Sequence, residues 1–277
     1  MGEAVNVQDW IGREETHTDY TARGPFKRLS AMLDREDESK AASLPPLGHW
    51  LCFLPEAAQA QLGPDGHPER GGLIPPLPLP MRMAAGSRLT FHEPIPFGAD
   101  VKRVSKIMNI VEKQGRTGTL AFLTYRYQVF AGSTLCVTEE FDVVFREKSG
   151  NVGPMPPGDR RESKIKRTID PQSPLLFRFS ALTYNGHRIH YDRDYATKVE
   201  GYPGLLVHGP LLATLLVDLF RRHKPNAAVR TFEYRAQRPV FDLAPFTVNL
   251  EETADGGADV WAADSDGYVA MSGHVGV

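Results

Sequence analysis

Residues 205–222 constrain the fold of this chain more than any other stretch. A short apolar run at 205–207 ends in His208-Gly209-Pro210, and leucines then recur at helical spacing. Pro210 suits the first position of a helix, where a missing N–H costs nothing, and Gly209 lets the backbone turn sharply. Because polar residues such as Thr214 and Asp218 share the opposite face, the pattern predicts a mostly buried helix over 210–222.

Alternating apolar and polar residues predict β-strands on both sides of this helix. The predicted strands are 88–95, 101–111, 123–129 and 135–145 before the helix and 229–240, 246–251, 259–263 and 268–277 after it. Residues 177–182 alternate in the same way and predict a further half-buried strand, while KQGRTG at 113–118 predicts a hairpin turn. Each group suits a curved antiparallel meander, so we predict an α+β protein in which each meander wraps a central helix. The central helix of the first group is only weakly marked.

A stretch at 148–167 that is rich in Gly and Pro and then charged separates the two groups. Such a composition is typical of a linker. We therefore expect a first unit over residues 1–150, a linker over 151–167 and a second unit over 168–277. Residues 73–80, LIPPLPLP, contain a PxxP pattern, for which an extended segment packed on the first unit is favoured over a partner-binding motif.

Composition argues against several classes of function. A net charge of −2 and a pI near 6.5 give no electrostatic reason to expect nucleic-acid or anionic-membrane binding. No apolar run approaches the roughly 20 residues of a membrane span, and the N-terminal residues lack the apolar core of a secretion signal. The only two cysteines, Cys52 and Cys136, lie far apart and fit a reducing cytoplasm. No GxGxxG or GxxxxGK loop points to an organic cofactor, so none is expected.

The loop at 184–190, YNGHRIH, carries the residue types of an acid–base site and precedes the predicted helix. Unpaired N–H groups and the positive end of the dipole at a helix start can hold a developing oxyanion. His190 suits proton transfer in both directions because the unperturbed pKa of histidine is about 6.5. A metal set of His187, His190 and His208 is a weak alternative, since no carboxylate is placed as a further ligand, and no metal is expected.

These residues resemble the motif of the MaoC-like hydratase and dehydratase family, whose members have the hotdog fold. His190 follows Asn185 by five residues, and His208-Gly209 stands at the start of the helix. With PMRMAAGSRLTF at 80–91, the chain resembles the two-hotdog branch, which includes hydroxyacyl-thioester dehydratase type 2 and the bacterial mesaconyl-CoA, methylfumaryl-CoA and itaconyl-CoA hydratases. The similarity covers most of the chain. It implies a double hotdog with a degenerate first unit that shapes the substrate site and a catalytic second unit.

The resemblance also implies a role for each motif residue. His190 takes a proton from water, the N–H of Gly209 holds the thioester carbonyl, the hydroxyl adds to the β-carbon, and the α-carbon is protonated from the same face. The family motif has an Asp where this chain has Asn185, whose amide cannot transfer a proton at neutral pH but can orient a water. Tyr184 and His208 are expected to contact the substrate, with His208 chiefly positioning the turn.

The implied reaction is the reversible hydration of an α,β-unsaturated acyl-CoA, and a short branched dicarboxylic acyl group is favoured over a fatty acyl chain. Arg82 or Arg235 is then expected to pair with the distal carboxylate. The alternatives are a 3-hydroxyacyl-thioester dehydratase of fatty acid synthesis that acts on carrier-protein substrates, a non-catalytic acyl-CoA-binding protein, and a thioesterase. Pairing of exposed strand edges between two chains, and hence a homodimer, is a further possibility.

Overall fold

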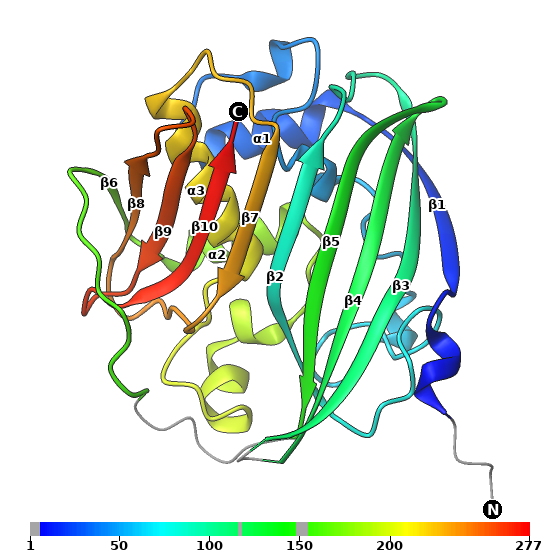
Figure 1. The fold of residues 1–277 in the computed structure, drawn as a ribbon. Helices are drawn as coiled ribbons and strands as arrows, with labels where there is room; N and C mark the ends of the chain where they lie inside the picture. The colour runs from blue at the N-terminus through cyan, green and yellow to red at the C-terminus, as the bar shows by residue number, and fades with distance from the viewer. Residues whose placement is uncertain (1–5, 116–117, 148–154) are drawn as a thin grey trace, which may run out of the picture.

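The computed structural model describes residues 6–115, 118–147 and 155–277. Within them, ten strands form one antiparallel sheet in the order β1-β3-β4-β5-β2-β7-β10-β9-β8-β6 (Figure 1). The strands are β1(Glu14–Tyr20), β2(Met81–Phe91), β3(Asp100–Gly115), β4(Gly118–Ala131), β5(Thr134–Arg146), β6(Ile165–Ile169), β7(Thr231–Ala236), β8(Phe246–Glu252), β9(Ala258–Ala263) and β10(Val269–Gly276). The α-helices are α1(Arg23–Met32), α2(Ser173–Leu182) and α3(Gly209–His223). The shorter 3-10 helices are η1(Val7–Trp10), η2(Glu38–Lys40), η3(Gly48–Leu51), η4(Gln59–Gln61) and η5(Arg188–His190), and η6(Tyr195–Val199) is a π-helix.

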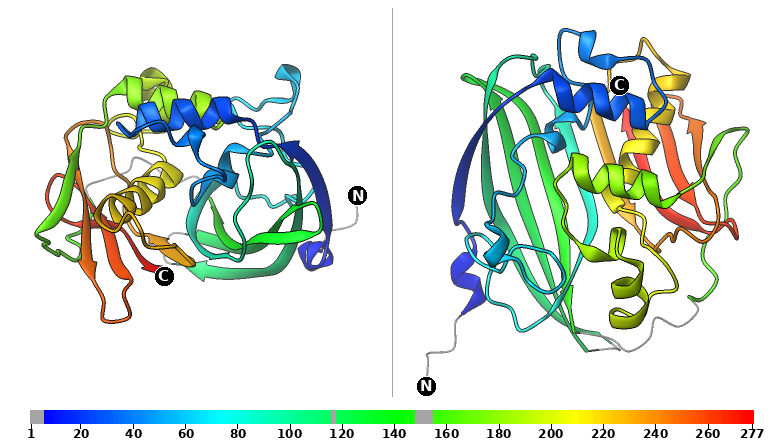
Figure 2. Two further views of the ribbon diagram at one scale, coloured as in Figure 1. Left: turned by 90° about the horizontal axis from the view of Figure 1, so that it is seen from above. Right: turned by 180° about the vertical axis from the view of Figure 1, so that it is seen from behind.

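Strands β2 and β7 join the two predicted meanders edge to edge. Gly86 of β2 lies opposite Arg235, and a Cβ at Gly86 would come within 2.4 Å of the Tyr234 carbonyl oxygen, so no side chain fits there. The predicted central helix of the second half is confirmed as α3, which lies against β8, β9 and β10 inside the curve of the sheet (Figure 2). No helix in the described parts of the chain is long and apolar enough to cross a membrane.

The first half covers its part of the sheet with shorter pieces. Buried residues of α1 and of the turn around η3 pack with apolar residues of β2 to β5; they include Phe26, Leu29, Leu47, Leu51, Leu89, Val101, Val129 and Val137. The extended segment at 73–80 covers the rest, with Leu73, Leu77 and Leu79 packed against Ile107, Leu123 and Phe145. The prediction of an ordered, packed segment there is confirmed. The described residues place no long helix against this half of the sheet.

The strand predicted at 177–182 is wrong, because these residues form the end of α2. Pro174 stands in the first turn of that helix, where it is tolerated, and Leu176, Phe179 and Ser180 are buried at helical spacing. Phe177, which the strand prediction placed toward the core, is 61% exposed. A run of six residues is too short for its periodicity to separate helix from strand.

Two strands were not predicted, and part of the linker prediction is corrected. β1 has no buried residue, which explains why its sequence carries no apolar alternation. β6 pairs with β8 from Ile165 onward, so residues 165–167 belong to the sheet and not to the linker. Residues 148–154 of the linker and residues 116–117 of the predicted hairpin turn lie outside the described residues.

Asp218 lies in the core and not on the polar face expected for it. Its side chain is 2% exposed and pairs with Arg35 at 2.7 Å, Arg167 at 3.1 Å and Arg222 at 2.8 Å. A buried carboxylate needs such partners, since an unpaired buried charge is costly. Because Arg35 follows α1, its pair with Asp218 ties the first half to α3.

Candidate active site

The loop after α2 is held by its own backbone and by Asn185. Tyr184 has a positive φ of 50°, and the Asn185 side-chain oxygen accepts a hydrogen bond from the His187 N–H at 3.0 Å. This is an Asx turn, in which a short amide side chain fixes the backbone two residues on. The Asn185 oxygen therefore shapes the loop that leads into η5 and to His190.

His190 is a buried base with one free ring nitrogen. The side chain is 7% exposed, and Nδ1 lies 2.7 Å from the Leu206 carbonyl oxygen. A carbonyl oxygen only accepts, so Nδ1 carries the proton and Nε2 keeps its lone pair. Burial lowers the pKa of His190 to about 4 despite the hydrogen bond to Leu206. At neutral pH the ring is therefore uncharged and able to accept a proton.

His208 packs behind His190 and leads into α3. It is fully buried, stacks on His190 with ring centroids 3.7 Å apart, and shares a 2.8 Å hydrogen bond with the Ser180 hydroxyl. Gly209 then begins α3, and a Cβ there would meet no atom within 4 Å. The first N–H groups of a helix have no partner inside the helix. The start of α3 therefore offers free donors to an open space beside His190.

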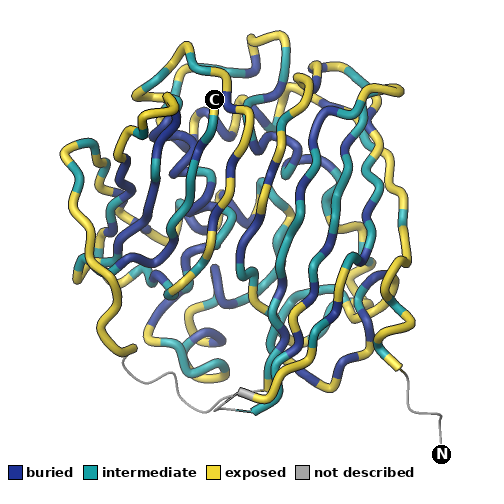
Figure 3. The backbone as a smooth tube through the Cα atoms, in the orientation of Figure 1, coloured by how far each residue is buried: buried dark blue, intermediate teal, exposed yellow. Residues whose placement is uncertain are grey.

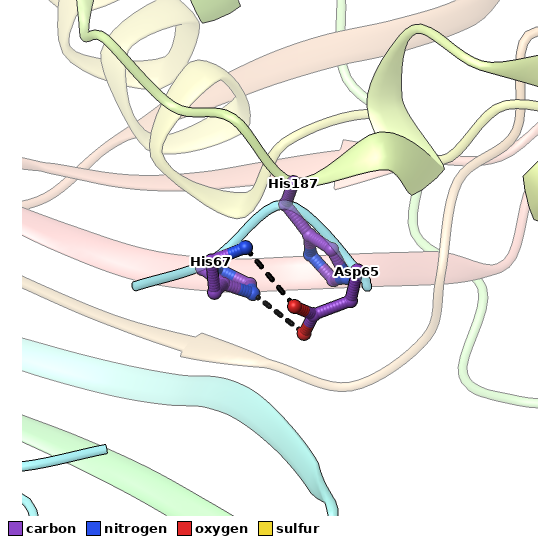
Figure 4. Close-up of side chains that lie close together, drawn as sticks. All are labelled: Asp65, His67 and His187. Carbon is purple, nitrogen blue, oxygen red and sulfur yellow. Dashed lines mark hydrogen bonds and ion pairs between the residues drawn. The ribbon is translucent and has the colours of Figure 1, made fainter. Parts of the chain in front are cut away.

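The first half contributes two further side chains to this region, Asp65 and His67 (Figure 4). The His67 ring lies 4.1 Å from His187, and His187 lies 5.4 Å from His190. Burial, with the neighbouring rings of His67 and His190, lowers the pKa of His187 to about 2. Four imidazoles, those of His67, His187, His190 and His208, thus follow one another from the loop of the first half to the start of α3.

Asp65 and His67 were not among the site residues predicted from the sequence. Their signal is an Asp and a His two residues apart in a Gly-rich segment, GPDGHP, which alone is too common to identify a site. Gly66 explains how the segment reaches the second half. A Cβ at Gly66 would come within 2.0 Å of the Gly186 carbonyl oxygen, and the Arg188 N–H donates to the Asp65 carbonyl oxygen at 2.9 Å.

Asp65, His67 and His187 also have the spacing of a metal site, since one ligand atom of each lies within 4.8 Å of the others. Two histidines and a carboxylate can hold a divalent ion. Two features oppose it. His67 Nδ1 is already bonded to Asp65 at 3.0 Å, and Arg82 lies close enough to His187 for its charge to lower the pKa of that ring. A nearby guanidinium repels a cation and attracts an anion.

Of the two candidate arginines, the structure brings only Arg82 to this region. Arg82 lies opposite Phe145, which is 1% exposed, so both point to the covered face of the sheet. Arg88, six residues further along β2, lies on the outer face, although an even spacing would place both arginines on the same face. A bulge between Ala84 and Gly86 explains this change of face. Arg235 follows the buried Tyr234 on β7, where exposed and buried residues alternate, so Arg235 points to the outer face, away from His190.

Tyr184 is 65% exposed, and the structure places its side chain in solvent and not against His190. Its contribution is the positive φ that turns the chain out of α2. The expected substrate contact of Tyr184 is therefore not supported by its position, whereas His190, His208 and Gly209 lie together as predicted.

The loop after α1 repeats the loop after α2. Each helix is followed by a residue with positive φ, and each next N–H donates to the carbonyl oxygen of a buried serine. The matching bonds are Arg35 N to Ser30 O at 2.9 Å and Asn185 N to Ser180 O at 2.8 Å. A short 3-10 helix then ends at Lys40 in the first half and at His190 in the second. Lys40 therefore stands in the place of His190.

The segment before α3 has a counterpart as well. The Leu44 N–H donates to Ile95 and the Val207 N–H to Val240, both at 2.8 Å. The next two residues are Pro45-Pro46 in the first half and His208-Gly209 in the second. Proline has no N–H, so the first half lacks a donor at the position that Gly209 fills. The repeat supports a catalytic second half and a first half without this chemistry.

A cavity of about 940 Å³ lies at the first-half loop and not at His190. Its lining includes Asp34, Arg35, Pro45 and Pro46, and none of the predicted site residues. Arg35 already pairs with Glu38 at 3.0 Å as well as with Asp218. Without a histidine or a helix N–H in the repeated positions, this cavity has no equivalent of the His190 site.

We expect the free energy of unfolding to fall as the pH drops from about 6.5 toward 4, because burial lowers the pKa of His187, His190 and His208. Below about 6.5 the unfolded chain binds protons that the folded chain does not, so stability is full above that pH and is lost below it. Each such histidine costs roughly 1.4 kcal/mol per pH unit in this window. Urea unfolding at several pH values measures the slope. His190→Asn is expected to make it shallower, and His17→Asn, at an exposed position, is expected to leave it unchanged.

Comparisons with known proteins identify relatives of this chain. Residues 47–242 match the family model described as hydroxyacyl-thioester dehydratase type 2. The chain is 47% identical over 270 residues to the mesaconyl-C(4)-CoA hydratase of Chloroflexus aurantiacus, covering 96% of each chain. It is 24% identical over 284 residues to the mitochondrial hydroxyacyl-thioester dehydratase type 2 of Schizosaccharomyces pombe, covering 90% of this chain and 93% of that one.

Solved structures share the architecture. A MaoC-like dehydratase from Phytophthora capsici has a TM-score of 0.73 at 16% identity and covers 98% of both chains. A Mycobacterium tuberculosis protein described as a double hotdog fold has a TM-score of 0.59 at 14% identity, covering 96% of this chain and 95% of that one. The predicted double hotdog is confirmed.

Proposed function

This chain belongs to the hydroxyacyl-thioester dehydratase type 2 family, and we propose that within it the protein hydrates a short dicarboxylic acyl-CoA of the mesaconyl type. The reversible hydration and dehydration of an acyl thioester is the reaction of this family and of the hydratase to which the chain is 47% identical, so the protein is a hydro-lyase. The acyl group and the role of each site residue are our proposal.

The observation that carries the proposal is the uncharged His190 with a free Nε2 beside the start of α3. The thioester carbonyl oxygen accepts a hydrogen bond from the Gly209 N–H, which stabilises the negative charge that develops on it. His190 Nε2 takes a proton from water as the oxygen adds to the β-carbon. The α-carbon then receives a proton, which completes the addition of water across the double bond. Asn185 acts through the loop that holds His190.

Arg82 supports the choice of a dicarboxylic substrate. It faces the covered side of β2 near His187, Tyr125 and Tyr127, and its charge acts on the pKa of all three. A mesaconyl group carries a free carboxylate at the end opposite its thioester. A guanidinium binds a carboxylate with two parallel hydrogen bonds. Arg82 is therefore our candidate for the residue that holds the distal carboxylate.

We expect the wild type to hydrate mesaconyl-CoA more efficiently than crotonyl-CoA, which lacks that carboxylate. Arg82→Met is expected to lower kcat/KM for mesaconyl-CoA by about 10- to 100-fold, the effect of losing a hydrogen bond to a charged group, and to change crotonyl-CoA hydration little. The loss of enoyl-thioester absorbance measures both rates. Arg235→Met is the matched control, because Arg235 lies on the outer face and both rates should stay at wild-type values. Equal loss on both substrates in Arg82→Met contradicts the proposed carboxylate contact.

A dehydratase acting on fatty acyl carrier-protein substrates is the second candidate, favoured by the similarity to the Schizosaccharomyces pombe protein. A series of enoyl-CoA and enoyl-carrier substrates of increasing length separates the two. Preference for long neutral chains contradicts the dicarboxylic proposal. A wild type that binds CoA esters without turnover supports the non-catalytic binder instead.

We also propose that the protein works in the cytoplasm. Cys52 and Cys136 are unpaired and buried, as suits a reducing compartment. A homodimer stays a prediction, which sedimentation or light scattering of the purified chain tests.

A further inference from the structure

The loop at 63–68 is built to present a side chain to the second half. The Gly63 N–H donates to the His67 carbonyl oxygen at 2.7 Å and so closes the loop. Gly66 packs directly against Gly186 of the second half. Arg188 fixes it further, with its side chain donating to the Pro64 carbonyl oxygen at 3.0 Å. Because these are mostly backbone contacts, the loop is held without using the outer edge of the His67 ring.

Asp65 and His67 form a pair with one defined tautomer. The His67 backbone N–H and Nδ1 each lie 3.0 Å from an oxygen of the Asp65 carboxylate. Burial alone would raise the pKa of Asp65, but the hydrogen bonds from His67 outweigh it and hold that pKa well below its usual range. The ionised carboxylate only accepts, so Nδ1 of His67 carries a proton and Nε2 is left for another partner. A carboxylate orients the histidine of hydrolase triads in the same way.

His67 and His190 flank the uncharged His187. Among the described residues, no carboxylate is hydrogen-bonded to His190, whose Nδ1 lies against the Leu206 carbonyl oxygen. Asp192 is occupied by Arg188 at 2.8 Å and by the Tyr195 N–H at 3.0 Å, while Asp194 pairs with Lys198 and is 78% exposed. The family motif has an Asp at the position that Asn185 occupies in this chain. The carboxylate nearest to the row of imidazoles is therefore Asp65, from the first half.

We propose that His67, oriented by Asp65, is a second acid–base residue of the hydration, so that proton removal and proton delivery are divided between the two halves of the chain. This inference rests on the proposed hydratase function. His190 Nε2 takes one proton from water while the hydroxyl oxygen bonds to the β-carbon, and the electron pair of the double bond moves to the α-carbon. His67 keeps its Nδ1 proton on the Asp65 carboxylate and gives a proton from Nε2 to that carbon. The cycle closes when the proton on His190 passes back to His67 through His187 or water, with no other reactant.

The two-residue scheme replaces the expectation that His190 serves proton transfer in both directions. The scheme also favours a proton-donating His67 over a metal ion in the cluster of Asp65, His67 and His187. A bound divalent cation would occupy Nε2 of His67 and leave no proton to give, and the charge of Arg82 disfavours it.

His67→Gln and Asp65→Asn test the proposal in the full-length protein. Both variants should fold, since the amide oxygen introduced by Asp65→Asn can still accept from the His67 N–H, and His67 is 22% exposed. We expect His67→Gln to lower kcat/KM for mesaconyl-CoA by about 10²-fold, within the range for a lost general acid, and Asp65→Asn by less. The pH profile of kcat/KM should lose the alkaline limb, which reports the group that must be protonated. Added imidazole should restore part of the activity of His67→Ala. His17→Gln, at an exposed position on β1, is the control.

Several results would overturn the inference. One is a His67→Gln enzyme with wild-type kcat/KM. Another is a His67→Gln enzyme that is slow but keeps both limbs of the pH profile, with no rescue of His67→Ala by imidazole, because a merely structural role gives that pattern. A third is a wild type inactivated by a chelator and restored by Zn²⁺, which would make the cluster a metal site. Each of these leaves the hydratase function standing. A wild type inert on both mesaconyl-CoA and crotonyl-CoA contradicts the proposed function and, with it, this inference.

Discussion

Replacing His190 by asparagine is expected to lower kcat/KM for the unsaturated thioester by about 10²- to 10⁴-fold, the effect of losing a general base. Asparagine can still donate to the Leu206 carbonyl oxygen, as Nδ1 does now at 2.7 Å, but it has no basic nitrogen in place of Nε2. The loop should therefore keep its shape while the site loses its proton acceptor. The loss of enoyl-thioester absorbance gives the rate, and circular dichroism checks the fold.

The pH dependence of the same reaction tests the state of His190. Because burial lowers its pKa to about 4, the base stays uncharged as the pH falls through the range where an exposed histidine would already be protonated. We expect the acid limb of kcat/KM to lie well below pH 6, and to be absent from the residual activity of His190→Asn. His17→Asn should match the wild type in rate and in profile. A His190→Asn enzyme within a few-fold of the wild type would assign the base to another residue.

Gly209→Pro is the second change with a large expected effect. Proline is tolerated at the first position of a helix, and the preceding His208 already has φ −63° and ψ 133°, which suit a residue before proline. The helix should therefore form, but without the Gly209 N–H. We expect kcat/KM to fall by about 10²- to 10³-fold, as when one oxyanion donor is removed.

Gly209→Ala is the matched control, because it keeps the N–H and adds only a methyl group that meets no protein atom within 4 Å. Its stability should equal or exceed that of the wild type, since alanine is the better helix former. Its kcat should stay above that of Gly209→Pro. If KM rises in the alanine variant, the open space before α3 is where the thioester lies. Equal kcat in the proline variant and the wild type would contradict the role proposed for this N–H.

The sequence alone determined the parts of the protein that depend on local pattern. The helix predicted at 210–222 is α3, because leucines at helical spacing, Pro210 and Gly209 act within a turn or two of the chain. The long strands of both meanders follow from alternation in the same way. The motif of Asn185, His190 and His208-Gly209 predicted the family by resemblance, and together with residues 80–91 it predicted the double hotdog.

Only the tertiary structure decided which residues meet around that motif. Simple alternation from Arg88 would place Arg82 on the outer face, but a bulge between Ala84 and Gly86 turns it inward, whereas Arg235 stays outside. A bulge depends on how two strands pair, and one strand's sequence does not show it.

The contribution of the first half to the site was equally invisible in the sequence. Asp65 and His67 stand more than a hundred residues before His187, and they reach it because Gly66 and Gly186 let two backbones touch. Figure 3 shows that buried residues recur along the strands of the whole sheet. Residues 177–182 were wrongly predicted as a strand, because six residues are too few to separate the helical period from the strand period. In the structure they are the end of α2, which buries Leu176, Phe179 and Ser180. Local periodicity depends on neighbouring residues and can be recognised in the sequence. Which face of a sheet a side chain occupies, and which two loops touch, depend on pairing and packing between segments far apart in the chain.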